Sequence, residues 1–382
     1  MSNLMAVRIG VPKETVPGER RVALVPEVVK RLARSGVEVA IENGAGAASG
    51  YPDASYSDAG AQVTSERGII FRSNILLKVQ APTLEEIAQI PPGGVLVALM
   101  NMSRNLDRIR ALRDGQVTVF ALDLLPRITR AQSMDVLSSQ ATVAGYRAAL
   151  IGAVLCPKFF PMMMTAAGTI RPAKVLILGA GVAGLVAIAT ARRLGAVVEA
   201  YDVRRAAGEQ VRSLGAKFLE LQINAEGQGG YARELTDEEK RQEQAMLAQA
   251  IGSADVVITT ANIPGRRAPR LVSTTTVDGM RPGSVIVDLA AETGGNCELT
   301  RPGEQIQYHD VTIAGPLNLP SSLPFHASEM FAKNLESFLG LLISKDRSLV
   351  ADYTDEILTA SVLVTQGEVR HAPTRDAIGG TK

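Results

Sequence analysis

The sequence has few of the residues on which several classes of protein depend. Its 382 residues include two cysteines, Cys156 and Cys297, and three histidines, His309, His326 and His371. Two cysteines cannot supply a disulfide framework, so the chain fits a reducing compartment. No two histidines stand four residues apart, which argues against a zinc site built on histidine, and we expect no bound metal.

Excess charge and long apolar runs are also missing. Lys plus Arg number 40 and Asp plus Glu number 39, a formal net charge of +1, so we expect no nucleic-acid partner. The uncharged, apolar run 175–191 has 17 residues including three glycines, whereas a membrane-spanning helix needs about 20 apolar residues. Residues 1–8 do not resemble a signal peptide, and we expect the chain by itself to be soluble.

What the sequence does contain is an alternation of strand-like and helix-like segments. Hydrophobic residues make up 46% of the chain and mean hydropathy is +0.12, enough for packed cores in two or three domains. The alternation predicts an α/β fold with two doubly wound, parallel-sheet, Rossmann-like domains. Expected strands are 7–11, 37–41, 75–79, 95–99, 117–122, 174–178, 197–201, 255–260, 284–289 and 311–314, separated by helical stretches such as 27–34, 106–113 and 182–194.

Two helical segments divide the chain into the expected domains. A polar segment, 127–140, leads into a helical pattern that runs to about Leu155 and is suited to a hinge. A second helix follows Pro324, with apolar residues at helical spacing over 331–342. Residues 349–382 are too few for a domain and should pack back on the first one. We therefore expect a discontinuous first domain, 1–145 plus 325–382, and a second domain, 146–324.

The strongest motif is a glycine fingerprint between a strand and a helix. Gly179, Gly181 and Gly184 have the G-x-G-x-x-G spacing, in which the glycines permit a tight turn, close approach of a pyrophosphate and close helix packing. The helix that begins near Val182 presents amide donors to the phosphates. Asp202 ends the next strand at the offset expected of a ribose-binding acid. The motif predicts a dinucleotide site.

Residues around Asp202 favour NAD(H) over NADP(H). A carboxylate there hydrogen-bonds the ribose hydroxyls and repels a 2′-phosphate. Val203 and Arg204 are further candidate contacts, although Arg204 and Arg205 weaken the preference because an arginine can pair with a 2′-phosphate. The alternative for both arginines is the first turn of a solvated helix. A second glycine cluster, 44–50, has Ser49 at its third position, and we interpret it as a loop.

Several segments occurring in order give the chain a family resemblance. It resembles the alanine dehydrogenase and transhydrogenase family, and most of all the NAD(H)-binding subunit of proton-translocating nicotinamide nucleotide transhydrogenases. The resemblance covers essentially the whole chain and is sharpest at 127–139 and 160–168. The segments are Gly-Val-Pro-Lys-Glu (10–14), Arg-Val-Ala (21–23), residues 127–139, Phe-Pro-Met-Met-Met-Thr-Ala-Ala-Gly (160–168) and Ala-Ala-Glu-Thr-Gly-Gly-Asn (290–296).

The resemblance implies an assembly and a reaction. A homodimer of this subunit would bind NAD(H) and dock against a partner subunit that binds NADP(H). Hydride would pass directly between the two nicotinamides, and a membrane-spanning subunit would couple that transfer to proton translocation. The chain would then be cytoplasmic and held at the inner membrane through its partner subunits.

The resemblance also implies site residues. The family's loop at the nicotinamide matches Arg127, Gln132 and Asp135, the candidate catalytic residues, with Ser138 one turn further. Its alternative is a polar helix N-terminus with Asp135 in the first turns. The remaining implied nucleotide contacts are Ile128 and Thr129, Gly230 and Tyr231 of a loop over 221–236 that closes on nucleotide, and Asn262 at a strand exit.

Two other functions are compatible with portions of the sequence. A soluble NAD-dependent alanine dehydrogenase is the main alternative, and a non-catalytic NAD(H)-sensing module is a third. Alanine dehydrogenases bind their acid through an arginine and a lysine, matched by Arg21 and Lys78. Their catalytic histidine is missing from 99–103, and Glu292 stands at their carboxylate position. Because amino-acid oxidation needs a proton acceptor and transfer between nicotinamides does not, the missing histidine favours transhydrogenation.

Overall fold

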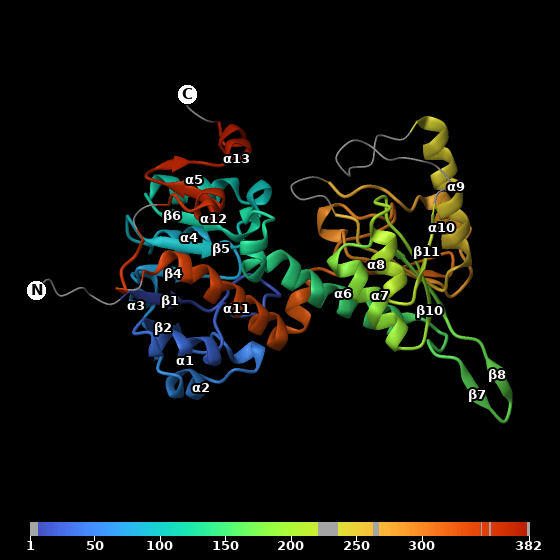
Figure 1. Ribbon diagram of the computed structural model, residues 1–382, viewed down its shortest axis with the longest axis horizontal. Helices are drawn as coiled ribbons and strands as arrows, with labels where there is room; N and C mark the ends of the chain where they lie inside the picture. Colours follow the sequence, from blue (N-terminus) through green and yellow to red (C-terminus); the bar gives the residue numbers. More distant parts are fainter. Residues whose placement is uncertain (1–6, 221–235, 263–266, 345, 351–352, 380–382) are drawn as a thin grey trace, which may run out of the picture. The chain divides into compact units, whose positions relative to one another are not determined.

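The computed structural model describes residues 7–220, 236–262, 267–344, 346–350 and 353–379 (Figure 1). The chain divides into two compact units. Unit 1 comprises residues 1–140 and 321–382, and unit 2 comprises residues 141–320. The expected closing loop with Gly230 and Tyr231 lies outside the described residues.

Unit 1 is built on an eight-stranded sheet with the order β17-β16-β6-β5-β4-β1-β2-β3, parallel from β6 to β3. Its strands are β1 (Arg8–Val11), β2 (Glu38–Glu42), β3 (Gln62–Thr64), β4 (Ile75–Leu77), β5 (Val95–Ala98), β6 (Thr118–Ala121), β16 (Val362–Thr365) and β17 (Glu368–Val369). Its helices are α1 (Pro26–Arg34), α2 (Asp53–Asp58), α3 (Arg67–Phe71), α4 (Leu84–Ile87), α5 (Leu106–Asp114), α11 (Pro324–Leu342), α12 (Glu356–Ser361) and α13 (Ala372–Ala377).

Both faces of this sheet are buried, which explains the uninterrupted aliphatic character of its strands. Val95 and Val97 face a core that includes residues of α1 and α11, whereas Leu96 and Ala98 face a second core with residues of α3 and α5. The strand-like runs near the start of the chain therefore form a parallel sheet covered on both sides, as predicted.

The C-terminal segment of the chain completes unit 1. The apolar stripe of α11, with Phe331, Leu335, Phe338 and Leu342, is fully buried in the first core. After it, β16 adds to the free edge of β6 in antiparallel orientation, and β17 forms a hairpin with β16. Residues 362–369 thus extend the sheet instead of lying on it.

Unit 2 contains a seven-stranded sheet with the order β11-β10-β9-β12-β13-β15-β14, in which all pairs except β14–β15 are parallel. Its strands are β9 (Lys174–Leu178), β10 (Val197–Tyr201), β11 (Lys217–Phe218), β12 (Val256–Thr259), β13 (Val285–Asp288), β14 (Gln305–Tyr308) and β15 (Val311–Ala314). Its helices are α7 (Val182–Arg193), α8 (Ala207–Ser213), α9 (Asp237–Ser253) and α10 (Thr274–Asp278). The two sheets confirm the predicted α/β fold.

Helix α6 (Val136–Leu155) begins in unit 1 and continues in unit 2. It is preceded by a six-residue 3₁₀ segment, η4 (Thr129–Met134), instead of by further α-helix. Pro157, two residues after the last residue of the helix, prevents its continuation. No helix among the described residues is both long and apolar enough to cross a membrane.

A two-stranded hairpin, β7 (Met163–Thr165) and β8 (Gly168–Ile170), projects from unit 2 (Figure 1). It pairs with neither large sheet, and every residue of both strands is exposed. Its base and strands carry large exposed hydrophobic side chains: Phe159, Met162, Met163, Met164 and Ile170. The hairpin thus presents an exposed apolar surface.

Candidate functional site

The glycine fingerprint forms the turn that its spacing predicts. Gly179 follows β9 with a φ of +104°, a conformation that residues with a side chain rarely adopt. A Cβ atom on Gly184 would lie 1.9 Å from the Gly179 carbonyl oxygen, so only glycine lets α7 approach the turn this closely. A Cβ on Gly181 would meet nothing within 4 Å. That open position before α7 leaves space for a pyrophosphate.

Thr260, at the exit of β12, fixes the same turn. Its hydroxyl donates to the carbonyl oxygen of Gly179 at 2.9 Å, and a Cβ on Gly179 would lie 2.6 Å from that hydroxyl oxygen. The sequence analysis assigned only Asn262 at this strand exit, and the role of Thr260 was missed because its partner is a backbone atom distant in sequence.

Asp202 closes the loop between β10 and the glycine turn. Its carboxylate accepts hydrogen bonds from the backbone N–H of Ala180 at 2.8 Å and of Arg204 at 2.8 Å. The guanidinium of Arg204 forks onto the same carboxylate, with Nε and Nη2 at 2.9 and 3.0 Å. Burial opposes ionisation of Asp202, but the hydrogen bonds and charge of Arg204 outweigh it and hold the pKa below its usual value. Val203 beside it is 61% exposed.

Asn262 lies exposed at the exit of β12 and its side-chain oxygen accepts from Thr293 at 3.3 Å. The loop behind it is held by Asn296, whose amide donates to the carbonyl oxygens of Ala261 and Pro269, both at 2.8 Å. Glu292 accepts the backbone N–H of Asn318 at 2.6 Å. No cluster of three or more His, Cys, Asp or Glu within the described ranges is arranged to hold a metal ion.

The second group of predicted residues belongs to unit 1 and lies on η4 and its flanks. Arg127 and Gln132 are exposed, and neither side chain has a hydrogen bond or ion pair among the described residues. Ile128 packs against the first core, and Thr129 begins the 3₁₀ segment. Within the segment, Ala131 and Met134 are 2% and 6% exposed, so two polar side chains project from a base that is anchored in the core.

Three polar contacts from far along the chain hold η4 in place. Asn334 of α11 donates to the carbonyl oxygen of Ser133 at 2.8 Å and accepts from Ser139 at 2.6 Å. Arg130 forms two hydrogen bonds to the carboxylate of Asp355, at 2.6 and 2.9 Å. Sequence reasoning missed Asn334 and Arg130. The available signal was one asparagine within the apolar stripe of α11.

Asp135 lies between η4 and α6 and caps that helix. Its two oxygens accept from the backbone N–H of Ser138 at 2.9 Å and from the Ser138 hydroxyl at 2.5 Å. The same aspartate therefore satisfies helix-terminal donors and orients a hydroxyl. The two interpretations offered for this segment, a helix terminus and a site, are compatible for Asp135 and Ser138.

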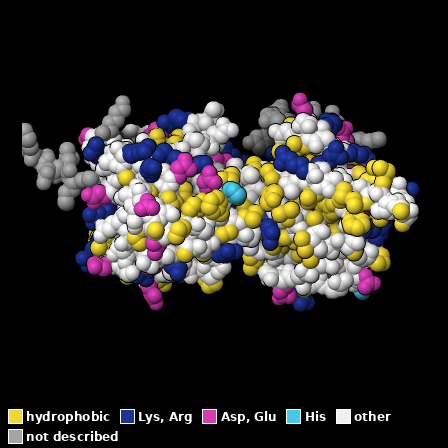
Figure 2. Space-filling view, turned by 90° about the horizontal axis from the view of Figure 1, so that it is seen from below, with side chains coloured by type: hydrophobic (Ala, Val, Ile, Leu, Met, Phe, Trp, Pro, Cys, Tyr) yellow, Lys and Arg dark blue, Asp and Glu magenta, His cyan; other side chains and the backbone are white. Residues whose placement is uncertain are grey.

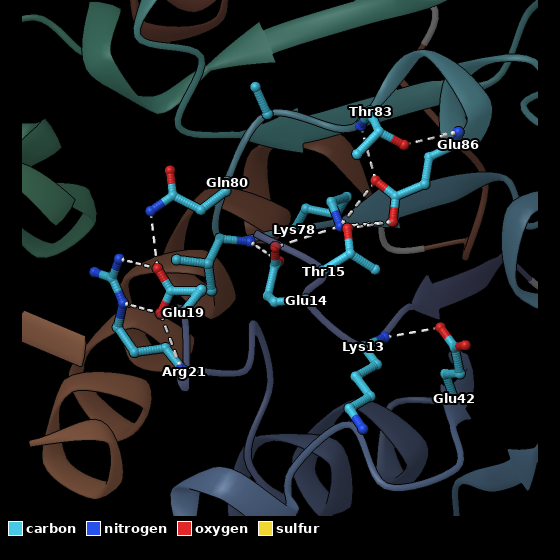
Figure 3. Close-up of polar contacts among 12 residues, drawn as sticks. Lys13, Glu14, Thr15, Glu19, Arg21, Glu42, Lys78, Gln80, Thr83 and Glu86 are labelled. Atoms are coloured by element: carbon cyan, nitrogen blue, oxygen red, sulfur yellow. Dashed lines mark hydrogen bonds and ion pairs between the residues drawn. The ribbon is translucent and has the colours of Figure 1, made fainter. Parts of the chain in front are cut away.

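Arg21 and Lys78, matched to the acid-binding pair of alanine dehydrogenases, are both buried in ion-pair networks (Figure 3). The guanidinium of Arg21 forks onto the carboxylate of Glu19 with distances of 2.8 and 2.6 Å, and its third nitrogen donates to Gln140 at 2.8 Å. Gln80 donates to the same carboxylate at 2.8 Å.

The ammonium of Lys78 lies 3.3 Å from carboxylate oxygens of both Glu14 and Glu86. All three side chains are at most 3% exposed. Both cations are thus committed to carboxylates of the chain itself. The exit of β5, where alanine dehydrogenases would have their histidine, carries Asn101 in the left-handed conformation with a φ of 43°.

Comparison with known proteins identifies the family of the chain. Residues 10–144 match the family described as alanine dehydrogenase/PNT, N-terminal domain, and residues 148–372 match the alanine dehydrogenase/PNT, C-terminal domain. The chain is 46% identical over 377 residues to an NAD(P) transhydrogenase subunit alpha chain of Rhodospirillum rubrum, covering 96% of this chain and 98% of that protein.

One solved structure and one more distant relative are also similar to the chain. The crystal structure of a transhydrogenase from Sinorhizobium meliloti superposes with a TM-score of 0.88 at 45% identity, covering 95% of this chain and 99% of that one. An alanine dehydrogenase of Mycobacterium tuberculosis is 31% identical over 332 residues, covering 83% of this chain and 82% of that one. These findings confirm the resemblance on which the site residues were assigned, and the chain belongs to the alanine dehydrogenase/PNT family.

Proposed function

We propose that this chain is the NAD(H)-binding component of a proton-translocating nicotinamide nucleotide transhydrogenase. Hydride passes directly between NAD(H) on this chain and NADP(H) on a partner subunit, and a membrane-spanning subunit couples the transfer to proton movement. The chain is cytoplasmic and is held at the inner membrane by these partners. The observation that carries the proposal is the anchored η4 segment with its preceding residues, from which Gln132 and Arg127 project without side-chain partners among the described residues.

The residues of unit 2 fit a dinucleotide. The open position at Gly181 and the N-terminus of α7 offer space and amide donors to a pyrophosphate, and Asp202 offers acceptors to ribose hydroxyls. When bound, the nicotinamide supplies the hydride chemistry. Asp202 has to share its carboxylate between Arg204 and the ribose.

The residues of unit 1 are suited to orienting the nicotinamide and take no part in the bond changes of hydride transfer. A carboxamide offers one acceptor and two donors, so Arg127 and the Ser138 hydroxyl, fixed by Asp135, can hold a nicotinamide ring in one orientation. Gln132 is free to hydrogen-bond across to the second nucleotide. Such positioning is what hydride transfer between two aligned rings requires.

The structure of unit 1 gives less support to alanine dehydrogenation. Arg21 and Lys78 are already paired with buried carboxylates, so binding an acid through them would have to break ion pairs at 2.6–3.3 Å. Purified protein is therefore expected to form no substantial NADH from alanine and NAD.

Replacing Asp202 by alanine is expected to narrow the preference for NADH over NADPH. The variant loses the acceptors for the ribose hydroxyls, so the Kd for NADH rises at least about tenfold, while NADPH loses less because repulsion of its 2′-phosphate also disappears. Calorimetric titration with both nucleotides measures the change. Arg193→Gln, which removes an exposed charge in the last turn of α7, serves as control and should leave the preference unchanged. Equal affinities of the wild type for NADH and NADPH would contradict the assignment.

Shortening Gln132 to asparagine is expected to slow hydride transfer without impairing NADH binding. The amide is kept while its reach falls by one methylene, and misplaced rings transfer hydride at least ~10-fold more slowly, about 1.4 kcal/mol of barrier. Stopped-flow transfer to a nucleotide on an NADP(H)-binding partner measures the rate, and titration measures the Kd. Gln62→Asn, at an exposed position of β3, is the matched control. Wild-type transfer by the Gln132 variant would remove this residue from the mechanism.

The proposed homodimer is supported by the hairpin of unit 2. Figure 2 shows hydrophobic side chains over much of this face of unit 2, and the hairpin residues Met162 and Met164 are 58% and 79% exposed. Replacing both by serine is expected to raise the dimer dissociation constant at least about tenfold, because burying one methionine contributes roughly 1.5–3 kcal/mol. Sedimentation velocity measures the change. Leu84→Ser, at a 51% exposed leucine of unit 1, is the control. An unchanged dissociation constant would remove the hairpin from the interface.

A pull-down of the chain from native membranes tests the partner assignments together. Recovery of both an NADP(H)-binding subunit and a membrane-spanning subunit is expected, and recovery of neither would contradict the proposed assembly.

A further inference from the structure

A cavity of about 560 Å³ opens in unit 2 at the edge of the sheet opposite the glycine turn. It lies where β9 begins, at Lys174, whereas Gly179 follows the other end of the same strand. Four of its ten lining residues are cations: Lys158, Arg171, Lys174 and Arg281. The cavity is separate from the proposed nucleotide site, and its volume is in the range of small-molecule sites.

The two lysines of the cavity are already neutralised. Lys158 lies 2.5 Å from Asp255, the cavity's one carboxylate, and Asp255 also accepts the backbone N–H of Lys174 at 2.9 Å. The ammonium of Lys174 lies 3.0 Å from Glu199 and donates to Ser253 at 2.8 Å. These contacts fix the floor of the cavity and leave its lysines little capacity for a ligand.

The two arginines are not neutralised. The side chains of Arg171 and Arg281 form no hydrogen bond or ion pair within the described ranges of the chain, and both residues are exposed. Each guanidinium offers a planar set of donors that can bind two oxygens of a phosphate. A phosphate has enough oxygens to bind both arginines at once, whereas a single carboxylate does not. Two guanidiniums without a counter-ion at one cavity therefore favour a ligand with two negative charges over a ligand with one.

The remaining walls are apolar. Pro157, Phe159, Ile170 and Pro172 line the cavity, and Phe159 is 55% exposed. A free inorganic phosphate would leave this surface uncovered. A flat apolar group attached to the phosphate would cover it, and aromatic contacts add to the free energy of binding beyond the buried area.

We propose that this cavity binds a phosphate monoester with an aromatic or apolar body, the phosphate held by Arg171 and Arg281 and the body against Phe159. This site is separate from the proposed nucleotide site, since none of its residues belongs to that site, but it shares Phe159 and Ile170 with the hairpin proposed for the homodimer contact.

The test uses the full-length protein saturated with NADH, so that the glycine turn is not available to the probe. Calorimetric titration compares phenyl phosphate with inorganic phosphate, two dianions that differ by the ring. Phenyl phosphate is expected to bind roughly threefold more tightly, and Phe159→Ser should abolish that difference while leaving inorganic phosphate unaffected. Binding of inorganic phosphate equal to phenyl phosphate would overturn the assignment of the apolar wall.

The arginines are tested separately. Arg171→Gln and Arg281→Gln are each expected to weaken both probes about tenfold, because each removes charge-assisted hydrogen bonds. Arg193→Gln, an exposed arginine at the end of α7 outside the cavity, should bind both probes as the wild type does. No saturable binding by the wild type, or an equal loss in the Arg193 variant, overturns the site. If Arg171→Gln and Arg281→Gln change the dimer dissociation constant but not the binding of either probe, the ligand site is overturned and the cavity belongs to the subunit interface.

Discussion

Replacing Lys78 by methionine is expected to lower the free energy of unfolding by about 3–5 kcal/mol, because it leaves buried carboxylates without their counter-ion. The ammonium lies 3.3 Å from oxygens of Glu14 and Glu86, and the lysine side chain is 1% exposed. Methionine has a similar length, so the apolar packing of the side chain is largely kept. The loss therefore reports the charge and not a cavity.

The pH dependence of that loss gives a second measurement. Burial raises the pKa of Glu14 above its usual value even though the charge of Lys78 opposes the rise. Without Lys78 the pKa of Glu14 rises further. A carboxyl group with a raised pKa favours the folded state while protonated, and that contribution is lost as pH rises through the folded-state pKa. The destabilisation of Lys78→Met is therefore expected to be larger at pH 8 than at pH 5.

Urea unfolding followed by circular dichroism measures both effects, since the chain has no tryptophan. Lys333→Met is the matched control: Lys333 is 50% exposed and forms an ion pair with Glu329 one turn away on α11. Its loss should stay below about 0.5 kcal/mol. Equal destabilisation by the two variants would mean that the buried position of Lys78 has no energetic importance.

Glu19 is expected to be a main source of acid sensitivity in unit 1. Burial opposes ionisation of this carboxylate, but the hydrogen bonds and charge of Arg21, with a hydrogen bond from Gln80, outweigh it and lower the pKa from 4.5 to about 2. A lowered pKa contributes stability above the unfolded-state value, and the contribution is lost as pH falls from 4.5 towards 2. Because the Glu19 side chain is fully buried, the interval corresponds to about 3 kcal/mol.

Glu19→Gln removes this titration. The difference in unfolding free energy between wild type and variant is expected to be largest at pH 7 and to shrink by about 3 kcal/mol towards pH 2. It does not reach zero, since the variant leaves the Arg21 guanidinium buried beside a neutral amide. Glu38→Gln, whose carboxylate is 53% exposed and pairs with Arg8, is the control and should cost less than about 1 kcal/mol at neutral pH. A difference that is constant from pH 7 to pH 2 would show that Glu19 does not carry the acid sensitivity.

The elements of the fold that could be predicted from sequence are those governed by local pattern. The strand Lys174–Leu178 and the turn at Gly179 were predicted because an aliphatic run meets glycines at a spacing that one backbone geometry requires. Several other segments escaped prediction. The hairpin 163–170 is exposed on both strands and has no apolar alternation towards a core, and the turn between β14 and β15 uses His309 and Asp310 at φ of 42° and 63° instead of glycine.

In the candidate site, too, local sequence pattern predicts some features and not others. Asp202 follows from its distance to the glycine turn, but its engagement by Arg204 does not, because a side-chain fork depends on rotamers. The residues of η4 were assigned through family resemblance and expected within a helix start. The 3₁₀ geometry they adopt depends on Asn334 and on Asp355, about 200 residues further along the chain and invisible to any local pattern.

The order of segments in unit 1 affects how the protein is synthesised. Its first core requires Phe331, Leu335 and Phe338 of α11, and its sheet requires β16, yet unit 2 is translated before any of them. While the ribosome makes residues 141–320, the apolar surface of α1 and the edge of β6 have no partner. Unit 2, whose residues are contiguous, can fold first and leave the nascent unit 1 as the species that chaperones meet.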